Sequence, residues 1–393
     1  MNRNGLLLCL ISSLALAACH ASEGPAGSSS SRSTAAKDAH GRATSPDHEA
    51  DDAAHFLAGI PGREGSPYKA LETQQAWIDH AKQMDEAWAR FEKRRKVGMA
   101  AFQKSELTGA PVDGSPIWYP FSGGDALTML TFFPGHTTYV MAALEPPGRV
   151  PKAAQLEQLD LAKELPLIAN TLSSLLGKSF FVTREMDRQL RGQVTDGVAE
   201  PMLIILARMG YQINNHKYVQ LDESGKLIPR TLEEKRAAFG KNRGLVLEIQ
   251  RDGEDPATLT YISLNLDDAH MKDNQPFKTY VAGLGKSCTL LKSTSYMMHS
   301  DGFKAIRQMV LDDSALIVQD DSGVPWKYFT QDEWQVQLYG DYVSPFGRDF
   351  QFRTQKDLRA AYEENRKSVK PLNFRMGYGA GKVESNLQVA RRK

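Results

Sequence analysis

The sequence contains little cysteine, almost no net charge and none of the common catalytic motifs. Its 48 Lys and Arg residues balance 47 Asp and Glu residues, which leaves a formal charge of +1 on 393 residues. A chain without a global field is not drawn to nucleic acid, so we expect no nucleic-acid partner. Glycine-rich phosphate loops, His-x-x-x-His pairs, paired cysteines and Gly-x-Ser-x-Gly elbows are absent, so the sequence predicts no metal site and no cofactor.

The first eighteen residues have the composition of an export signal. Arg3 precedes an apolar run of about eleven residues, Leu6 to Leu16, which is too short to span a bilayer. The segment Leu16-Ala17-Ala18-Cys19 resembles the lipobox of bacterial lipoproteins. The resemblance implies that Cys19 becomes the first mature residue and carries lipid that anchors the chain in a membrane. Because His20 follows instead of Asp, it also implies sorting to the outer membrane, facing the periplasm; an ordinary secretory signal is the alternative.

The three cysteines leave no internal disulfide in such a mature chain. Cys9 departs with the signal, Cys19 takes the lipid, and Cys288 remains alone. Cys288 lies in an apolar stretch, so we interpret it as a small buried hydrophobic residue and not as a nucleophile.

Residues 19–60 are predicted to be a lipidated, disordered tether. The segment is rich in Ser, Ala, Gly, Asp and His, and it has almost no large apolar residue before Phe56. We interpret His20, His40, His48 and His55 as solvated linker residues because their spacing is irregular, with metal capture as the alternative.

Residues 61–380 are predicted to form one α+β body, followed by a basic tail at 381–393. Helical periodicity appears near 68–105, 153–176 and 200–209, with Pro166 expected to divide the second segment into two helices. Two hairpins, Tyr218–Pro229 and Leu245–Leu266, favour a mixed, mainly antiparallel central sheet flanked by these helices. The basic run Lys93–Lys96 is interpreted as a solvated helix face, with contact to anionic headgroups as the alternative.

A faint internal repeat suggests two related halves at 112–240 and 241–350. Thr138-Tyr139-Val140 and Leu176-Gly177-Lys178 in the first half match Thr260-Tyr261-Ile262 and Leu284-Gly285-Lys286 in the second. A duplicated unit would place a cleft between the halves, whereas matches this short also arise by chance.

Two clusters contain the residue types of a hydrolase. Ser122 and Asp125 lie in a glycine-rich loop with His136 eleven residues further on, and Ser295 and His299 share one face if they lie on an α-helix. The competing interpretations are a tight turn for the first cluster and a histidine at a helix C-terminus for the second.

A third cluster follows an apolar strand at Ala315 to Val318. Asp320 and Asp321 there provide oxygens for a cation or, alternatively, acceptors for a turn. If the chain brings them together with Tyr119, Asp125 and His299 in one cleft, these five residues are the predicted ligand-binding set.

The C-terminal stretch is locally basic. Residues 353–393 contain eleven Lys or Arg against four Asp or Glu. The stretch is interpreted as a frayed tail, with contact to acidic envelope polymers or headgroups as the alternative.

The segment Tyr119-Pro120-Phe121-Ser122-Gly123-Gly124-Asp125 resembles a segment, Tyr-Pro-Phe-Ser-Gly-x-Asp, shared by a group of exported bacterial proteins of unassigned activity. The resemblance extends over roughly 115–380 and implies one recurring body on variable anchors, without an activity or a catalytic residue. The lipid anchor, the flexible tether, the lack of a recognisable catalytic motif and the locally basic C-terminus lead us to expect a lipid-anchored binding or assembly factor with an envelope protein or polymer as partner. A hydrolase acting on an envelope substrate is the alternative.

Overall fold

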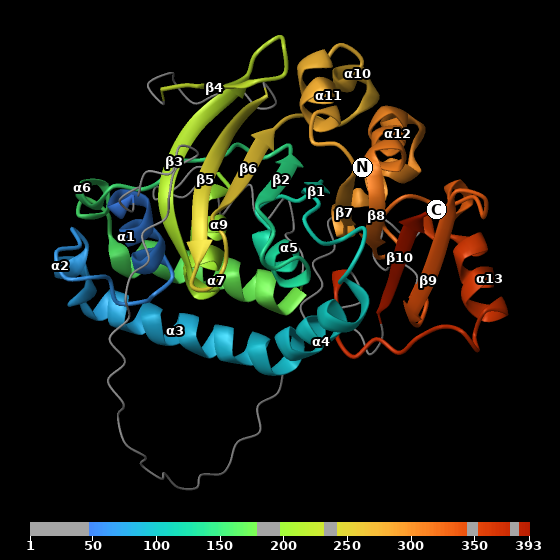
Figure 1. The fold of residues 1–393 in the computed structure, drawn as a ribbon. Helices are drawn as coiled ribbons and strands as arrows, with labels where there is room; N and C mark the ends of the chain where they lie inside the picture. The colour runs from blue at the N-terminus through green and yellow to red at the C-terminus, as the bar shows by residue number, and fades with distance from the viewer. Residues whose placement is uncertain (1–46, 179–196, 232–241, 344–352, 378–384) are drawn as a thin grey trace, which may run out of the picture. The chain divides into compact units, whose positions relative to one another are not determined.

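The body is built on one ten-stranded mixed sheet with the order β4-β3-β5-β6-β2-β1-β7-β8-β10-β9 (Figure 1). A computed structural model describes residues 47–178, 197–231, 242–343, 353–377 and 385–393. The strands are β1 (Ile117–Pro120), β2 (Thr138–Ala143), β3 (Tyr211–Leu221), β4 (Leu227–Pro229), β5 (Arg243–Arg251), β6 (Ala257–Ser263), β7 (Ser287–Leu291), β8 (Ser314–Gln319), β9 (Trp334–Gly340) and β10 (Asn386–Arg392).

Helices cover both faces of this sheet. They are α1 (His48–Leu57), α2 (Lys69–Glu72), α3 (Gln75–Phe91), α4 (Val97–Glu106), α5 (Ala126–Phe132), α6 (Ala153–Leu156), α7 (Leu161–Lys178), α9 (Ala199–Arg208), α10 (Asp268–Met271), α11 (Gln275–Ala282), α12 (Lys304–Asp313) and α13 (Lys356–Glu364). Shorter elements are the π-helical η1 (Glu92–Lys96) and the 3₁₀ turns η2 (Ser293–His299), η3 (Asp301–Phe303) and η4 (Trp326–Tyr328).

Alternate residues of the central strands pack into two separate cores. In β1, Ile117 and Tyr119 join the core formed with α1, α3, α4, α5, α7 and α9, whereas Trp118 joins the core formed with α10, α11 and α12. This alternation follows from the two-residue period of a strand. Because both faces are covered, the central strands are buried on both sides and mainly apolar, as buried parallel strands are.

The α+β class is confirmed, but the prediction of a mainly antiparallel sheet is wrong. The five central strands β6, β2, β1, β7 and β8 are all parallel, and antiparallel pairing is confined to the two margins. Helix α5 links β1 to β2, helices α10 and α11 link β6 to β7, and α12 links β7 to β8. Such helical crossovers produce parallel neighbours, and local hairpin signals do not reveal them.

Strands β2 and β6 are direct hydrogen-bonded neighbours, with Tyr139 opposite Leu259 and Met141 opposite Tyr261. The two supposed halves therefore contribute adjacent strands to one sheet, and a cleft between halves does not separate these strands.

The tether prediction is wrong for residues 47–60, because α1 forms there. Asp47 caps the helix by accepting a hydrogen bond from the Ala50 amide at 3.3 Å, and it also binds His216 of β3. The small apolar face around Ala50, Ala54 and Leu57 packs against α9 and β3. The prediction failed because the alanines of this segment were interpreted as linker residues from the composition alone. At helical spacing the same alanines form a narrow face that can be buried. Residues 19–46, including His20 and His40, lie outside the described residues.

Most of the remaining predictions of helices and hairpins are confirmed, and the one at Pro166 is wrong. Helices α2 to α4, helix α9 and the hairpins β3–β4 and β5–β6 lie where the pattern places them. Pro166, however, lies inside α7 and does not divide it; the interruption falls at 157–160, between α6 and α7.

The predicted basic tail is a strand and not a frayed end. Strand β10 pairs with both β8 and β9, and Leu387, Val389 and Ala390 are buried. Arg391 donates to the Glu106 carbonyl of α4, and Arg392 lies 4.6 Å from the ring centre of Trp334. The basic residues thus lie at the end of a buried strand that joins β8 to β9, the last strand of the sheet.

Candidate functional site

The five parallel strands take the chain order 3-2-1-4-5, which is the order of doubly wound nucleotide-binding sheets. After β1 the chain crosses to β2 on one side, and after β7 it crosses to β8 on the other. Strands β1 and β7 are adjacent, so the crossover connections diverge between them. In open sheets of this kind, ligands bind outside the carboxyl ends of the strands at this switch point.

A pocket of about 260 Å³ lies at this position. The segments that follow four strands line it: Phe121, Ser122 and Gly123 after β1; Leu144 and Glu145 after β2; Leu264, Asn265 and Leu266 after β6; and Lys292, Ser293 and Thr294 after β7. Met297 and Phe303 from the following 3₁₀ turns complete the wall. We call this cavity the switch-point pocket.

The backbone is strained at two points of its wall. Phe121 has a φ of 61° and Ser293 a φ of 59°, in the left-handed region that non-glycine residues rarely adopt. The Ser293 hydroxyl is also buried and has no hydrogen-bond partner among the described residues. Strain and unsatisfied polar groups both cost stability, and they cluster where a protein binds or reacts with something.

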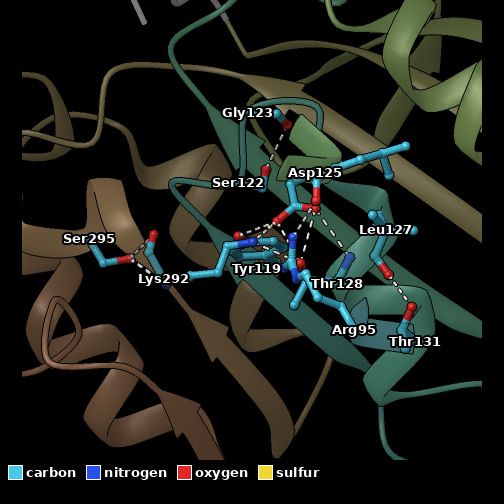
Figure 2. Close-up of polar contacts among 11 residues, drawn as sticks. Arg95, Tyr119, Ser122, Gly123, Asp125, Leu127, Thr128, Thr131, Lys292 and Ser295 are labelled. Carbon is cyan, nitrogen blue, oxygen red and sulfur yellow. Dashed lines mark hydrogen bonds and ion pairs between the residues drawn. The ribbon is translucent and has the colours of Figure 1, made fainter. Parts of the chain in front are cut away.

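Beneath the pocket, Lys292 and Asp125 form a buried ion pair (Figure 2). Their side chains are 1% and 2% exposed. Asp125 also accepts hydrogen bonds from the Tyr119 hydroxyl at 3.1 Å and from the amide of Thr128 at 3.2 Å, which caps helix α5. Lys292 donates to the Thr128 hydroxyl at 2.7 Å. The pair thereby joins the loop after β1 to the end of β7.

Arg95 extends this network toward the helical layer. Its side chain is buried, lies near Asp125 in Figure 2, and donates to the Leu176 carbonyl of α7 at 2.8 Å. Burial lowers the pKa of Arg95 to about 10, although the charge of Asp125 acts in the opposite direction. The guanidinium remains protonated at neutral pH and supplies a second buried cation.

Two further carboxyl groups lie at the end of β8. Asp320 accepts a hydrogen bond from the Ser322 amide at 2.9 Å, so the interpretation of this segment as a turn with an Asp acceptor is confirmed. Burial raises the pKa of Asp320, and the charge of Lys292 partly opposes this shift. Burial and the neighbouring Asp320 charge raise the pKa of Asp321 to about 8, and Asp321 accepts a hydrogen bond from Tyr296.

Two buried cations, Lys292 and Arg95, lie among three buried carboxyl groups in this network, those of Asp125, Asp320 and Asp321. Close carboxyl groups do not both ionise readily, and the direction of the Asp321 shift agrees with this rule. Burial also lowers the pKa of Lys292, with Asp125 opposing that effect, so the pair depends on mutual proximity.

The first set of hydrolase candidates does not meet. The Ser122 hydroxyl donates to the neighbouring Gly123 carbonyl at 3.1 Å. Asp125 is engaged by Lys292, as described above. His136 lies before β2, at the opposite end of the strand from the pocket, with its ring bonded to the Ser115 carbonyl at 2.8 Å. The arrangement gives neither a nucleophile–base contact nor a common pocket for these side chains.

Ser295 and His299 are also apart, because η2 is a 3₁₀ turn. With three residues per turn, positions i and i+4 do not share a face. Ser295 accepts a hydrogen bond from the Lys292 amide at 3.2 Å, whereas His299 bonds the Gly323 carbonyl at 2.9 Å. Burial lowers the pKa of His299 to about 4, so its ring is neutral at physiological pH.

The predicted ligand-binding set is brought into one region but not into one pocket. Tyr119 and Asp125 border the switch-point pocket, whereas Asp320 and Asp321 belong to the buried network behind it. His299 lies beside that network: its ring centre is 5.2 Å from that of Tyr296, and its ring bonds the Gly323 carbonyl in the turn that follows Asp321.

Three residues of the site, Lys292, Arg95 and Glu145, were not predicted. Each carried a usable signal. Lys292 directly follows the strand that ends in Leu290-Leu291, and Glu145 comes shortly after the apolar run Val140–Leu144. Arg95 lies four residues after Phe91 and four before Met99, within the apolar seam itself.

Comparison with known proteins adds no relative, because no family model, curated protein or solved structure matches the chain. In the described part of the chain, no helix combines the length and the apolar character that a bilayer crossing requires. The same residues contain no group of three or more His, Cys, Asp or Glu side chains placed to hold a metal ion. The assignment of the site therefore depends on its geometry.

Proposed function

We propose that the protein binds a small, phosphate-free ligand of nucleoside size in the switch-point pocket. The observation that carries this proposal is the position of the pocket at the diverging crossovers of a sheet with 3-2-1-4-5 order. The sheet order alone is a fold-level analogy, so the ligand class must follow from the residues of the pocket.

The size and the walls of the pocket favour a single flat ring system. A volume of about 260 Å³ lies near the lower end of ligand pockets, roughly 300–1,000 Å³, and is too small for a dinucleotide. The walls are mainly apolar, and Leu144 and Met297 at the pocket remain 47% and 37% exposed. Apolar side chains left open to solvent around a cavity are typical of a binding site.

Glu145 is placed to bind hydroxyl groups. It follows β2, somewhat over twenty residues after the glycine turn, where nucleotide-binding sheets carry an acid that binds ribose. Burial raises the pKa of its carboxyl group. Its carboxylate has no hydrogen bond or ion pair with another described side chain, so it is available to a ligand.

Asp125 argues against a phosphate. In dinucleotide-binding sheets the pyrophosphate occupies the N-terminus of the helix after the first strand. Here the carboxylate of Asp125 already accepts the Thr128 amide at that position in α5. With Glu145 nearby, the pocket favours a neutral or cationic ligand.

Isothermal titration of the full chain in detergent tests this proposal. The probe is adenosine, with AMP and NAD as phosphate-bearing comparisons. We expect adenosine to bind more tightly than either, and Glu145→Gln to weaken binding by about tenfold, the cost of one charge-assisted hydrogen bond. Glu157→Gln is the matched control, because Glu157 is exposed and distant from the pocket lining. Equal affinities for Glu145→Gln and Glu157→Gln, or no heat with adenosine at millimolar concentration, would disprove the proposal.

We further propose that this binding body is held in the cell envelope by lipid on Cys19, at the outer membrane and facing the periplasm. The lipobox-like segment Leu16-Ala17-Ala18-Cys19 supports this proposal. Cys19→Ser should shift the protein from the detergent phase to the aqueous phase and block cleavage before residue 19. Sucrose-gradient fractionation distinguishes outer from inner membrane. Unchanged partitioning together with an unchanged mature N-terminus would contradict lipidation.

A further inference from the structure

We infer that a second cavity, separate from the switch-point pocket, binds clustered phosphate groups. Its volume is about 1,410 Å³, and it lies among α3, η1, α13 and the segment 369–375. Among the described residues, its lining includes seven Lys or Arg against one Asp and one Glu: Arg90, Arg94, Arg95, Arg359, Arg366, Lys370 and Arg375, with Asp341 and Glu363. We call it the basic cavity.

This excess of positive charge is local, because the whole chain is almost neutral at +1. The cations come from segments far apart in the sequence, so no single charge run accounts for them; the fold brings them together. A concave surface lined by one sign of charge focuses its field and attracts ions of the opposite sign.

The cavity supplies little counter-charge of its own. Lys370 pairs with Glu106 at 2.9 Å, and Arg90 has a long contact of 3.8 Å with Glu86 at the exposed surface. Arg94, Arg366 and Arg375 are exposed and form no ion pair with the residues that the structure describes. Their mutual repulsion is relieved by a bound anion.

The residue type indicates which anion fits. Six of the seven cations are arginine, whose planar guanidinium donates two parallel hydrogen bonds to phosphate oxygens. Several phosphates on one ligand would engage the separate arginines together, whereas a lone carboxylate would satisfy only one of them. The shared chemistry is therefore a group of phosphates, supplied either by a polymer or by lipid headgroups.

A competition assay with labelled inorganic polyphosphate and full-length protein tests this inference. The triple variant Arg94→Ser/Arg366→Ser/Arg375→Ser should bind at least tenfold more weakly and show a smaller dependence on salt. The control Lys82→Ser/Lys163→Ser/Lys272→Ser removes the same charge from exposed positions outside the cavity and should change affinity less than threefold. Equal losses in the two triple variants, or no binding at low salt, would overturn the inference.

Two further measurements identify the source of the phosphates and test whether the basic cavity is independent of the switch-point pocket. Displacement by vesicles of anionic phospholipid supports clustered lipid headgroups, whereas displacement only by unlabelled polyphosphate supports a polymer; displacement by millimolar glycerol 3-phosphate, which carries a single phosphate, would contradict the requirement for a cluster. Glu145→Gln should leave polyphosphate binding unchanged, because Glu145 lines the other pocket. Parallel loss of adenosine and polyphosphate binding in Glu145→Gln would contradict two separate sites.

Discussion

Removal of the buried Lys292 charge should destabilise the fold far more than removal of an exposed lysine. Lys292→Met keeps the length of the side chain but leaves Asp125 without its ion-pair partner and Asp320 without the nearest cation that opposes its burial. Breaking a buried ion pair by deleting one partner costs about 3–5 kcal/mol. That is a large part of the roughly 5–15 kcal/mol by which proteins are stable.

Urea unfolding followed by circular dichroism measures this loss. With an m-value of about 3 kcal/mol/M, the midpoint should fall by roughly 1–1.7 M. Lys217→Met is the control, because Lys217 pairs with Glu248 at 2.7 Å with side chains 50% and 36% exposed. Exposed pairs of this kind contribute about 0–1 kcal/mol.

A double variant separates the charge effect from the loss of packing. Asp125→Asn keeps an oxygen that accepts the Thr128 amide but removes the charge that Lys292 neutralises. The combined Lys292→Met/Asp125→Asn variant should therefore lose less than the sum of the two single losses. The reasoning is refuted if Lys292→Met lowers the free energy of unfolding no more than Lys217→Met does. It is also refuted if the losses of the two single variants simply add in the double variant, because Lys292 and Asp125 would then not stabilise each other.

Three further outcomes test the network and its surroundings. Asp321 has a native pKa of about 8 against about 3.9 in an unfolded chain, so the native state alone holds this proton between these values and stability should decline as pH rises from about 4 to about 8. Asp321→Asn should reduce that decline in urea unfolding at pH 5, 7 and 9, and an unchanged slope would contradict the assignment. Arg95→Leu should cost about 2–4 kcal/mol because it removes a buried positive charge that interacts with Asp125 and leaves the buried Leu176 carbonyl without its donor, whereas exposed Arg94→Leu should change stability by less than about 0.5 kcal/mol. Burial raises the pKa of Cys288 to about 12, so maleimide should label it only after unfolding, and rapid native labelling would exclude the buried position.

Local patterns predicted the elements of this fold but not their order in the sheet. Hairpins β3–β4 and β5–β6 join strands that are neighbours in sequence, and turn residues mark them directly. Strand β7, in contrast, pairs with β1 although Ile117 and its partner Cys288 are 171 positions apart in the sequence, and β10 enters between β8 and β9 from the C-terminus. Apolar runs in buried parallel strands look alike, so they carry no information about which strand lies beside which.

The candidate site was predicted where its residues form a local motif. Tyr119 and Asp125 lie six residues apart around a glycine turn, and both border the pocket. Lys292 and Arg95 were missed because a lone cation is seldom fully buried, so a lysine after a strand and an arginine within a basic run both suggest solvent. The partner that allows their burial, Asp125, comes from another part of the chain.

The inward position of Arg95 follows from its spacing in the helix. Arg95 lies four residues after Phe91 and four before Met99, so the three side chains share one face, and Arg95 reaches the Leu176 carbonyl there. The segment Glu92–Lys96 is π-helical, and Met99 is buried where the pattern allowed either Gly98 or Met99. The same turn leaves Lys93 and Arg94 outside, so the prediction of a solvated basic face holds for these two residues and fails for Arg95.

Several features that oppose stability lie at the switch-point pocket. Positive φ at Phe121 and Ser293, the unpartnered Ser293 hydroxyl and the buried Lys292–Asp125 pair all lie at the carboxyl ends of β1 and β7. Apolar residues of similar volume would often stabilise such a position as well as a buried ion pair does, so stability alone does not explain the choice. Strain and unsatisfied polar atoms also occur away from the pocket, for example at the Asn242 backbone and the Trp334 indole. It is their combination with a cavity at the switch point that favours a binding role for this end of the sheet.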